Sequence, residues 1–493
     1  MTLITHWISG APVDAGEQQS LYDPATGEPS GSVVMADDAI VDQAVLSAAK
    51  AFASWSQTSL AQRSAVMFRF RQLLEDYSDT LALCTVRQHG KTMDDARGEV
   101  RRGIEVVEYA CGLGHLLKGE HSQNVSTGVD TYSVRQPLGV IAGITPFNFP
   151  VMVPLWMFPI ALAAGNSFVL KPSDRDPGPS LILAELLQQA GLPEGVFNVV
   201  QGGKPAVDRI LDHPDVAAVS FVGSTPVARH VYGRATGNGK RVQALGGAKN
   251  HAVVLPDADL ALAADAITAA AFGSAGQRCM AISVVVAVGA VADPLLEALA
   301  ARSRRIIVGD GENTTSQMGP LISGEHLQRV TELIGTGTPD GATLIMDGRT
   351  LSHDTGGHFL GPTIFDHVTP AMRVYTEEIF GPVLCVVRVD TFDEAIELIN
   401  ANPYGNGTAI FSTDGGACRT FQTRVTAGMV GINVPVPVPV AYHSFGGWKN
   451  SLFGDLHVYG RDGLQFCTRG QVVTSRWPTR SDGPNFSFPT TDR

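Results

Sequence analysis

The stretch Gly139-Val140-Ile141-Ala142-Gly143-Ile144 leads without a break into Thr145-Pro146-Phe147-Asn148-Phe149-Pro150. The first half has the apolar, β-branched composition of a buried strand, and the second half has the prolines of a turn. Comparable short strands are expected at 167–170, 196–200 and 217–222. Between the strands we expect one helix that ends at 164 and two more at 180–190 and 206–213. This alternation predicts a parallel, doubly wound sheet of the α/β class.

Helix and strand patterns are also found on both sides of this region. Towards the N-terminus, hydrophobic periodicity predicts amphipathic helices at 37–55, 61–84 and 94–111. Towards the C-terminus we expect a second α/β unit, with strands at 283–288, 343–347 and 383–389 and helices at 293–307, 324–334 and 392–400. A chain of 493 residues also exceeds what one hydrophobic core usually supports, so two or more domains are expected.

Charge and cysteine usage exclude several classes of protein. A net charge of −12 argues against a nucleic-acid partner. The six cysteines contain no CxxC pair, so neither a metal site nor a disulfide framework is indicated, which is typical of a reducing compartment. The most apolar stretch, 151–170, is interrupted by Pro154, Pro159 and Gly165, so no membrane span is expected. The N-terminus has no signal-peptide pattern, and we expect a cytoplasmic protein.

Gly276-Gln277-Arg278-Cys279 follows the run Phe272-Gly273-Ser274-Ala275, in which the last three residues are small. Small neighbours leave a thiol accessible and an adjacent cation lowers its pKa, so Cys279 is a candidate nucleophile. Taken alone, such a cysteine is more often a small buried hydrophobe. The rest of the chain favours the nucleophile.

A nucleotide is expected at the carboxyl ends of the first set of strands. In Ser220-Phe221-Val222-Gly223-Ser224-Thr225 a strand ends at a glycine and hydroxyl residues open a helix, which suits a pyrophosphate. An ordinary helix N-cap would have the same sequence, and no GxGxxG motif is present.

Six motifs together resemble the aldehyde dehydrogenase superfamily, in its order and spacing over nearly the whole chain. They are Pro146-Phe147-Asn148-Phe149-Pro150, Lys171-Pro172-Ser173, Phe221-Val222-Gly223-Ser224-Thr225, Leu245-Gly246-Gly247, Gly276-Gln277-Arg278-Cys279 and Glu377-Glu378-Ile379-Phe380-Gly381-Pro382. Within the superfamily the chain resembles the CoA-acylating branch of methylmalonate-semialdehyde dehydrogenases, through Gly246-Gly247-Ala248-Lys249-Asn250-His251, Arg278-Cys279-Met280-Ala281-Ile282-Ser283 and the proline repeat at 433–439.

The resemblance implies a fold with a Rossmann-like NAD-binding domain (1–120 and 138–246), a catalytic α/β domain (247–445), and a small β oligomerisation element with a C-terminal segment (121–137 and 446–493). It implies NAD as cofactor, CoA as co-substrate and a homotetramer, with small molecules as the other partners. The polar–apolar alternation at 126–136 is typical of an exposed hairpin, and we expect 470–476 to pair with it across a subunit boundary. The tail 478–493 is either an ordered extension or frayed.

Site roles implied by the resemblance can be assigned residue by residue. Cys279 is the nucleophile, and the Asn148 amide with the Cys279 N–H forms an oxyanion hole. The cofactor is expected to contact Phe147, Lys171, Gly223, Ser224, Glu378 and Phe380, and Phe445 to line the aldehyde pocket. The substrate carboxylate needs a cation, for which Arg102 is favoured and Arg278 comes second.

Hydrolytic members of the superfamily carry a glutamate just before Leu-Gly-Gly, and here that place is taken by Ala244. Alanine cannot act as a general base, so attack of water on the thioester loses a contribution of roughly 10²–10⁴-fold. The sequence therefore predicts NAD-dependent oxidation of malonate semialdehyde or its 2-methyl homologue, loss of CO₂, and transfer of the acetyl or propionyl group to CoA. The alternative is a hydrolytic enzyme in which another group, such as Glu377, activates water.

Overall fold

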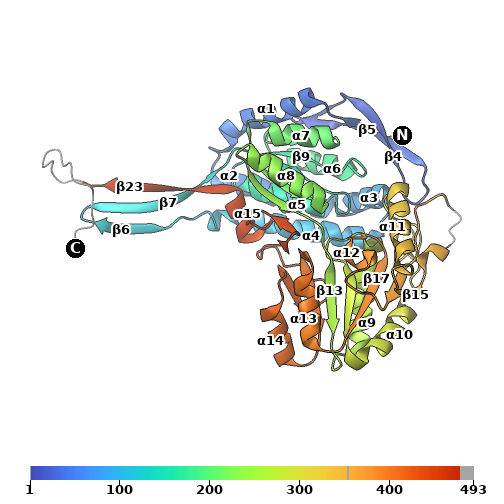
Figure 1. The fold of residues 1–493 in the computed structure, drawn as a ribbon. Helices are drawn as coiled ribbons and strands as arrows, with labels where there is room; N and C mark the ends of the chain where they lie inside the picture. Colours follow the sequence, from blue (N-terminus) through green and yellow to red (C-terminus); the bar gives the residue numbers. More distant parts are fainter. Residues whose placement is uncertain (1, 352–354, 478–493) are drawn as a thin grey trace.

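The computed structural model describes residues 2–351 and 355–477. Figure 1 shows two α/β units and a long ribbon of strands that extends away from them. The α/β class is therefore confirmed. Within the described ranges, no helix is long and apolar enough to cross a membrane.

The first sheet has the strand order β22-β12-β11-β8-β9-β10-β2-β3. Its five central strands are parallel: β12 (Arg241–Leu245), β11 (Val216–Val222), β8 (Val140–Ile144), β9 (Ser167–Lys171) and β10 (Phe197–Val199). Antiparallel strands β22 (Leu452–Phe453), β2 (His6–Ile8) and β3 (Ala11–Val13) complete its edges. The chain winds from β8 to β10 on one side and continues with β11 and β12 on the other. The winding direction thus reverses between β8 and β11, which is where such sheets bind ligands.

Helices cover both faces of this sheet. One face packs against α1 (Asp38–Trp55), α7 (Lys204–Asp212) and α8 (Thr225–Gly237). The other packs against α5 (Met152–Ala163) and α6 (Gly178–Gln189), and α2 (Leu60–Asp76) and α4 (Met93–Cys111) pack on these helices. Successive residues of β8, β9 and β12 belong alternately to the two hydrophobic clusters, as the two-residue period of a strand requires.

The second sheet has the order β15-β16-β17-β14-β13-β19-β20 and a hydrophobic core of its own. Its strands are β15 (Thr343–Met346), β16 (Thr363–Asp366), β17 (Val383–Val389), β14 (Ile282–Val288), β13 (Asn250–Val254), β19 (Gly407–Phe411) and β20 (Met429–Ile432), and all neighbours except β15 and β16 are parallel. Its helices are α9 (Leu260–Phe272), α10 (Ala292–Ser303), α11 (Gly324–Gly337), α12 (Arg373–Thr376), α13 (Phe392–Ala401) and α14 (Gly415–Arg424). The expected residue boundaries of the domains stay a prediction.

The ribbon that extends from the body in Figure 1 is a three-stranded sheet of order β23-β7-β6. It comprises β6 (His121–Ser126), β7 (Val129–Pro137) and β23 (Thr468–Arg476). β23 pairs with β7 of the same chain, from Thr468 opposite Pro137 to Arg476 opposite Val129. The expectation that 470–476 pairs with this hairpin across a subunit boundary is therefore wrong. The tail 478–493 lies outside the described residues.

Smaller elements complete the chain. They are β1 (Thr2–Ile4), β4 (Glu17–Tyr22), β5 (Pro29–Met35), β18 (Tyr404–Gly405), β21 (Trp448–Lys449) and α15 (Gly460–Phe466). The single helix expected at 61–84 is wrong, because α2 ends at Asp76 and α3 (Ser78–His89) begins after Tyr77. Leu74 and Leu81 are both buried, seven residues apart, so the apolar periodicity runs across the break and conceals it. The other expected helices and strands are confirmed, with ends that shift by at most four residues.

The contact between α4 and α5 leaves no room for a side chain at Gly103. A Cβ at Gly103 would lie 2.5 Å from Cδ1 of Leu155, whereas a Cβ at Gly98 on the same helix would have no atom within 4 Å. We expect Gly98→Ala to stabilise the fold by about 0.5–1 kcal/mol through helix propensity. Gly103→Ala should instead lose about 1–3 kcal/mol through overpacking. Thermal unfolding of the two variants checks this, and equal midpoints would contradict the close approach.

Candidate active site

A cleft of about 550 Å³ is lined by loops of both units. The first unit contributes Pro146, Phe147, Asn148, Val222, Gly223, Ser224, Thr225, Pro226, Gly246 and Gly247, and the second contributes Cys279, His326, Arg329, Thr376, Glu377, Glu378, Phe380 and Tyr404. Both expected catalytic residues and five of the six expected cofactor residues thus line one cleft. Lys171 does not line it.

The two sheets present opposite edges to this cleft. Asn148 follows β8 and Gly223 follows β11, so the first sheet contributes the carboxyl ends of its strands. Cys279 precedes β14 and Glu378 precedes β17, so the second sheet contributes amino ends. A ligand at the carboxyl ends of the first sheet is expected from the sequence, whereas the amino ends contributed by the second sheet are not.

The loop before Cys279 has a strained backbone. Ser274 and Ala275 both have φ of +52° and Gly276 has φ of +69°, in the left-handed region. Such conformations cost non-glycine residues roughly 1–2 kcal/mol each. Gly276 is required for a second reason, because a Cβ there would lie 2.2 Å from the carbonyl oxygen of Gly381. Gly276 is therefore required by this turn, whereas Ser274 and Ala275 adopt their conformations at a cost.

Side chains from three directions hold the loop in place. Nδ2 of Asn250 donates to the Cys279 carbonyl at 2.9 Å, and Nδ2 of Asn406 donates to the same oxygen at 3.1 Å. Asp95 on α4 accepts from the Ser274 N–H at 3.0 Å. These bonds fix the position of the cysteine relative to both units.

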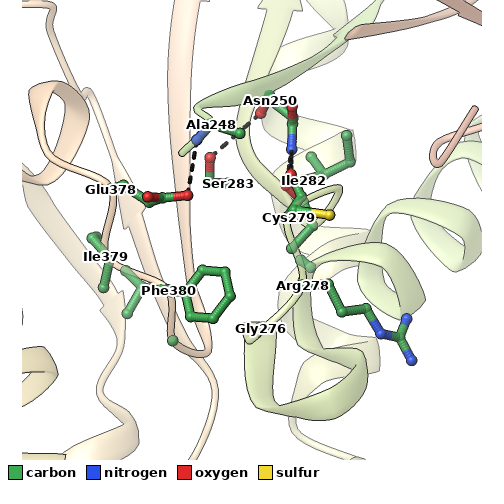
Figure 2. Close-up of a pocket in the computed structure, with 14 residues that line it drawn as sticks. Ala248, Asn250, Gly276, Arg278, Cys279, Ile282, Ser283, Glu378, Ile379 and Phe380 are labelled. Carbon is green, nitrogen blue, oxygen red and sulfur yellow. Dashed lines mark hydrogen bonds between the residues drawn. The ribbon is translucent and has the colours of Figure 1, made fainter. Parts of the chain in front are cut away.

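Arg278 has only a weak effect on the thiol. Its guanidinium forms an ion pair with Asp95, and Figure 2 shows the side chain extending away from the Cys279 sulfur. Burial, followed by the nearby carboxylate of Glu378, raises the pKa of the Cys279 thiol to about 12. The backbone amides of Cys279 and Met280 lower this pKa, and Arg278 lowers it less than they do. The expected direction of the Arg278 effect is therefore confirmed, but the net pKa of the thiol is raised and not lowered.

A second, small cavity of about 20 Å³ adjoins Cys279 and is drawn in Figure 2. The Phe380 ring and the Glu378 side chain lie across this cavity from Cys279. Oε1 of Glu378 accepts from the Ala248 N–H at 2.8 Å, and burial raises the pKa of the Glu378 carboxyl. Glu378 is thus a half-buried carboxylate of the site rather than a solvated surface group.

The loop that carries Glu378 is held by its carbonyl oxygens. Lys249 donates to Glu377 O, Arg329 donates to Glu378 O and Ile379 O, and the ring of His326 bonds to Phe380 O, at 2.7–2.9 Å. Phe380 has φ of +59°, and its ring meets Phe147 edge-on at 5.8 Å between centroids. None of these three basic residues is assigned a site role from the sequence. The available signals are the place of Lys249 in a motif of the resemblance and the spacing of His326 and Arg329, one turn apart on a helix.

Asn148 is buried, with 3 % of its surface exposed. Its backbone carbonyl accepts from the Lys91 ammonium at 2.6 Å, while its side-chain amide makes no hydrogen bond to any of the described residues. A buried amide that lacks a partner and faces the cleft of Cys279 is suited to binding a carbonyl oxygen or an oxyanion.

The loop between β11 and α8 fits the pyrophosphate of a dinucleotide. Ser224 is the N-cap of α8 but makes no side-chain capping bond, so the first amides of the helix remain available as donors. Thr225 instead accepts from the Gly247 N–H at 2.8 Å. A Cβ at Gly247 would lie 2.1 Å from Oε2 of Glu378, so a side chain there would fill the cleft.

Lys171 lies at the carboxyl end of β9 and is buried, with 6 % of its surface exposed. Burial lowers the pKa of its ammonium, against the raising effect of Asp174 and Asp176. Its ribose-binding role stays a prediction.

The three residues expected to bind substrate lie outside the larger cleft. Arg102 on α4 bonds to Glu105 at 2.5 Å and to the Pro439 carbonyl at 2.8 Å. Phe445 is buried and packs on Trp156, with 4.7 Å between centroids, in the hydrophobic cluster against which Cys279 also packs. Arg278 is paired with Asp95 as described above. Their roles stay predictions.

Ala244 lies in the middle of the first sheet, where its side chain packs in the cluster under α1, α7 and α8. The next residue, Leu245, belongs to the opposite cluster, against which Cys279 packs. Gly246 and Gly247, which follow these two residues, line the cleft. The expectation that position 244 decides between water and CoA stays a prediction. Neither the Ala244 nor the Leu245 side chain can act as a base. Glu377 bonds through Oε1 to Arg373, and both side chains are partly exposed.

Comparisons with known proteins agree with this arrangement. A model of the aldehyde dehydrogenase family matches residues 12–473. A malonate-semialdehyde dehydrogenase from Pseudomonas aeruginosa is 52% identical over 99% of this chain and 100% of its own length. The crystal structure of a methylmalonate-semialdehyde dehydrogenase from Oceanimonas doudoroffii has a TM-score of 0.96 and 53% identity, over 97% of this chain and 99% of that one. A Sinorhizobium meliloti protein named as a candidate methylmalonate-semialdehyde dehydrogenase, complexed with NAD, has a TM-score of 0.96 and 51% identity over the same shares.

The raised pKa of Cys279 predicts how the thiol reacts in the chain without cofactor. Below a pKa of about 12 the thiol is mostly neutral, so the thiolate fraction grows about tenfold for each pH unit. Alkylation of Cys279 by iodoacetamide, followed by peptide mass spectrometry, should therefore accelerate from pH 7 to pH 10 without a plateau. Arg278→Gln should change these rates less than threefold, because the guanidinium is paired with Asp95. A plateau below pH 9 that is lost in Arg278→Gln would show that Arg278 acts on the thiol.

Proposed function

The chain belongs to the aldehyde dehydrogenase family, and we propose that it oxidises malonate semialdehyde and its 2-methyl homologue with NAD and transfers the acyl group to CoA. The observation that carries the proposal is the meeting of Cys279 with the unbonded amide of Asn148 in a cleft that also reaches the N-terminus of α8. A nucleophile, an oxyanion donor and a dinucleotide site then share one space.

NAD bound in this cleft supplies the hydride acceptor. Its pyrophosphate would be held by the amides after Gly223 and Ser224, and its ribose hydroxyls by Lys171 and by the Glu378 oxygen that Ala248 leaves free. Phe147 and Phe380 would pack beside the nicotinamide. The ion pair between Arg175 and Glu325 occupies the arginine that could otherwise bind a 2′-phosphate, which favours NAD over NADP.

The chemistry of the chain begins at the Cys279 sulfur. Its thiolate adds to the aldehyde carbon, and the oxygen that becomes negative accepts hydrogen bonds from Nδ2 of Asn148 and from the Cys279 N–H. Loss of hydride from the same carbon leaves a thioester on Sγ. The carboxylate β to that thioester departs as CO₂ through a thioester enolate, which is then protonated. The CoA thiolate displaces Cys279 and forms acetyl-CoA or propionyl-CoA.

Transfer to CoA rather than to water follows from the groups beside the thioester. General-base activation of water requires a base within hydrogen-bond reach. Leu245 and Ala244 cannot serve, and Glu377 is bonded to Arg373. A thiolate needs no such base to attack a thioester.

Two arginines are proposed to hold the substrate carboxylate. Arg102 is favoured, because it and Cys279 both lie close enough to the Tyr459 hydroxyl to influence its pKa. To bind substrate it would exchange Glu105 or the Pro439 carbonyl for the incoming carboxylate. Arg278 would have to leave Asp95.

We propose a homotetramer assembled through the projecting sheet, and a cytoplasmic location. Both outer strands of that sheet have a free edge in the described chain, and Val472 on β23 is 69 % exposed. An unpaired strand edge tends to associate with other strands unless it is covered, and we propose that a second copy of the chain covers it. All six cysteines are free thiols, which fits a reducing compartment. Light scattering of the full chain checks the mass of the assembly.

The proposal predicts that turnover depends on CoA. NADH formation from malonate semialdehyde and its 2-methyl homologue should be sustained only when CoA is present, with acetyl-CoA and propionyl-CoA as products by mass spectrometry. Cys279→Ala should abolish NADH formation. Equal turnover without CoA, with a free acid as product, would support the hydrolytic alternative instead.

The residue before Leu-Gly-Gly predicts whether water can be activated. Ala244→Glu restores the carboxylate that hydrolytic members of the superfamily carry there, and should raise CoA-independent turnover by roughly 10-fold or more, towards the 10²–10⁴-fold typical of a general base. Ala244→Gln has similar size and no base, and should leave that rate unchanged. Equal rates in Ala244→Glu and Ala244→Gln would show that a carboxylate at this position does not activate water.

A further inference from the structure

A fully buried ion pair lies beneath the turn that carries Asn148. Nζ of Lys91, in the segment between α3 and α4, is 2.7 Å from Oε2 of Glu99 on α4, and both side chains have no exposed surface. Glu99 is the only carboxylate bonded to Lys91 among residues 2–351 and 355–477. Nothing in the proposed reaction uses this pair directly.

The pair forms hydrogen bonds with the backbone at Asn148 and just after the turn. Lys91 Nζ donates to the Asn148 carbonyl at 2.6 Å and lies 4.4 Å from the centroid of the Phe149 ring. The other oxygen of Glu99 accepts from the amides of Val151 and Met152, at 2.7 and 3.1 Å. These amides open α5, whose N-cap residue makes no side-chain capping bond. Lys91 thus holds the backbone within the turn as a donor, and Glu99 holds it at the start of α5 as an acceptor.

Stability alone is a poor explanation for such a pair. Removing two charges from water costs several kcal/mol per ion, and well-packed apolar residues often replace a buried pair without loss of stability. An apolar pair could fill the space, but it could not hold the Asn148 carbonyl and the α5 amides at set positions. The hydrogen bonds are directed at the backbone that flanks one functional side chain.

We infer that Lys91 and Glu99 are positioning residues that hold the Asn148 amide at the place where the aldehyde oxygen becomes negative. The inference rests on the proposed role of Asn148 in the oxyanion hole. A single oxyanion donor is worth roughly 10²–10³ in rate, and displacement of about 1 Å can cost as much as 10²-fold. Loss of the pair should therefore reduce the rate of hydride transfer with little effect on NAD affinity.

The test is a double-mutant cycle with Asn148→Ala. The variant Lys91→Met/Glu99→Gln removes both charges and keeps an acceptor for the α5 amides. We expect it to slow the pre-steady-state formation of NADH about 10- to 100-fold and to change the Kd of NAD less than twofold. In the Asn148→Ala background the same change should slow the reaction less than threefold, because the group it positions is gone.

A control and a second variant keep the result interpretable. Lys240 is also a buried lysine that binds backbone carbonyls, those of His213 and Val216, away from Asn148. Lys240→Met should lower the thermal midpoint without slowing NADH formation more than twofold. If Lys91→Met/Glu99→Gln does not fold, Lys91→Arg carries the comparison, because it keeps the charge but cannot reproduce the short bond to Asn148 O.

Three outcomes are distinct. The inference is overturned if Lys91→Met/Glu99→Gln slows NADH formation equally in the wild-type and Asn148→Ala backgrounds. It is also overturned if Lys91→Met/Glu99→Gln does not slow NADH formation although Asn148→Ala does. Either result leaves the proposed function intact. An Asn148→Ala variant with unchanged NADH formation would overturn the oxyanion role itself. A large effect that disappears in the Asn148→Ala background supports the inference.

Discussion

The register of the parallel strands is the constraint on which the site depends. Ile144 of β8 is level with Lys171 of β9 and Phe221 of β11, and Phe221 is level with Ala244 of β12. The loops that follow these strands therefore start from one edge of the first sheet. On the second sheet, Asn250 is level with Ile282, so the amino ends of β13 and β14 coincide as well. Residues that are more than a hundred positions apart in sequence meet because two sheet edges face one another.

Strain at the nucleophile is supported by residues on both sides of the cleft. Ser274 and Ala275 adopt left-handed conformations that are unfavourable for side chains with a Cβ. Asp95 of the first unit binds the Ser274 amide, while Asn250 and Asn406 of the second bind the Cys279 carbonyl. The loop is thus held by hydrogen-bond partners from both units, and these partners come together only when both units are folded and in contact. Reactivity of Cys279 consequently depends on the whole architecture, although the motif around it is only four residues long.

Much of this site could be predicted from the sequence, and the failures have identifiable causes. The apolar run before Asn148 and the hydroxyl residues after Gly223 carry local signals for a strand, a turn and a helix start, and the six motifs supply the order. The Tyr77 break was concealed because Leu74 and Leu81 keep the helical period across it. The direction of Arg278 depends on Asp95, 183 positions away, which no local pattern reveals. The sequence around Lys91 and Glu99 does not reveal their role, because their backbone partners Asn148, Val151 and Met152 are 52–57 positions away.

Most basic side chains around the cleft bind the protein rather than a ligand. Lys91 holds the Asn148 carbonyl, Lys249 and Arg329 hold the loop before Phe380, and Arg278 holds Asp95. An ionic group in such a site serves first as a directed hydrogen-bond donor, since backbone carbonyls are fixed in space and a buried cation must have partners. A substrate that carries its own carboxylate must therefore compete with a partner already in place. An aldehyde without a carboxylate leaves the arginine paired with its protein partner. Its binding therefore costs less than it would if the arginine were unpaired. Selectivity for a semialdehyde then requires that the incoming carboxylate binds better than Glu105 or Asp95 does, and the bidentate geometry of a guanidinium provides a way to achieve this.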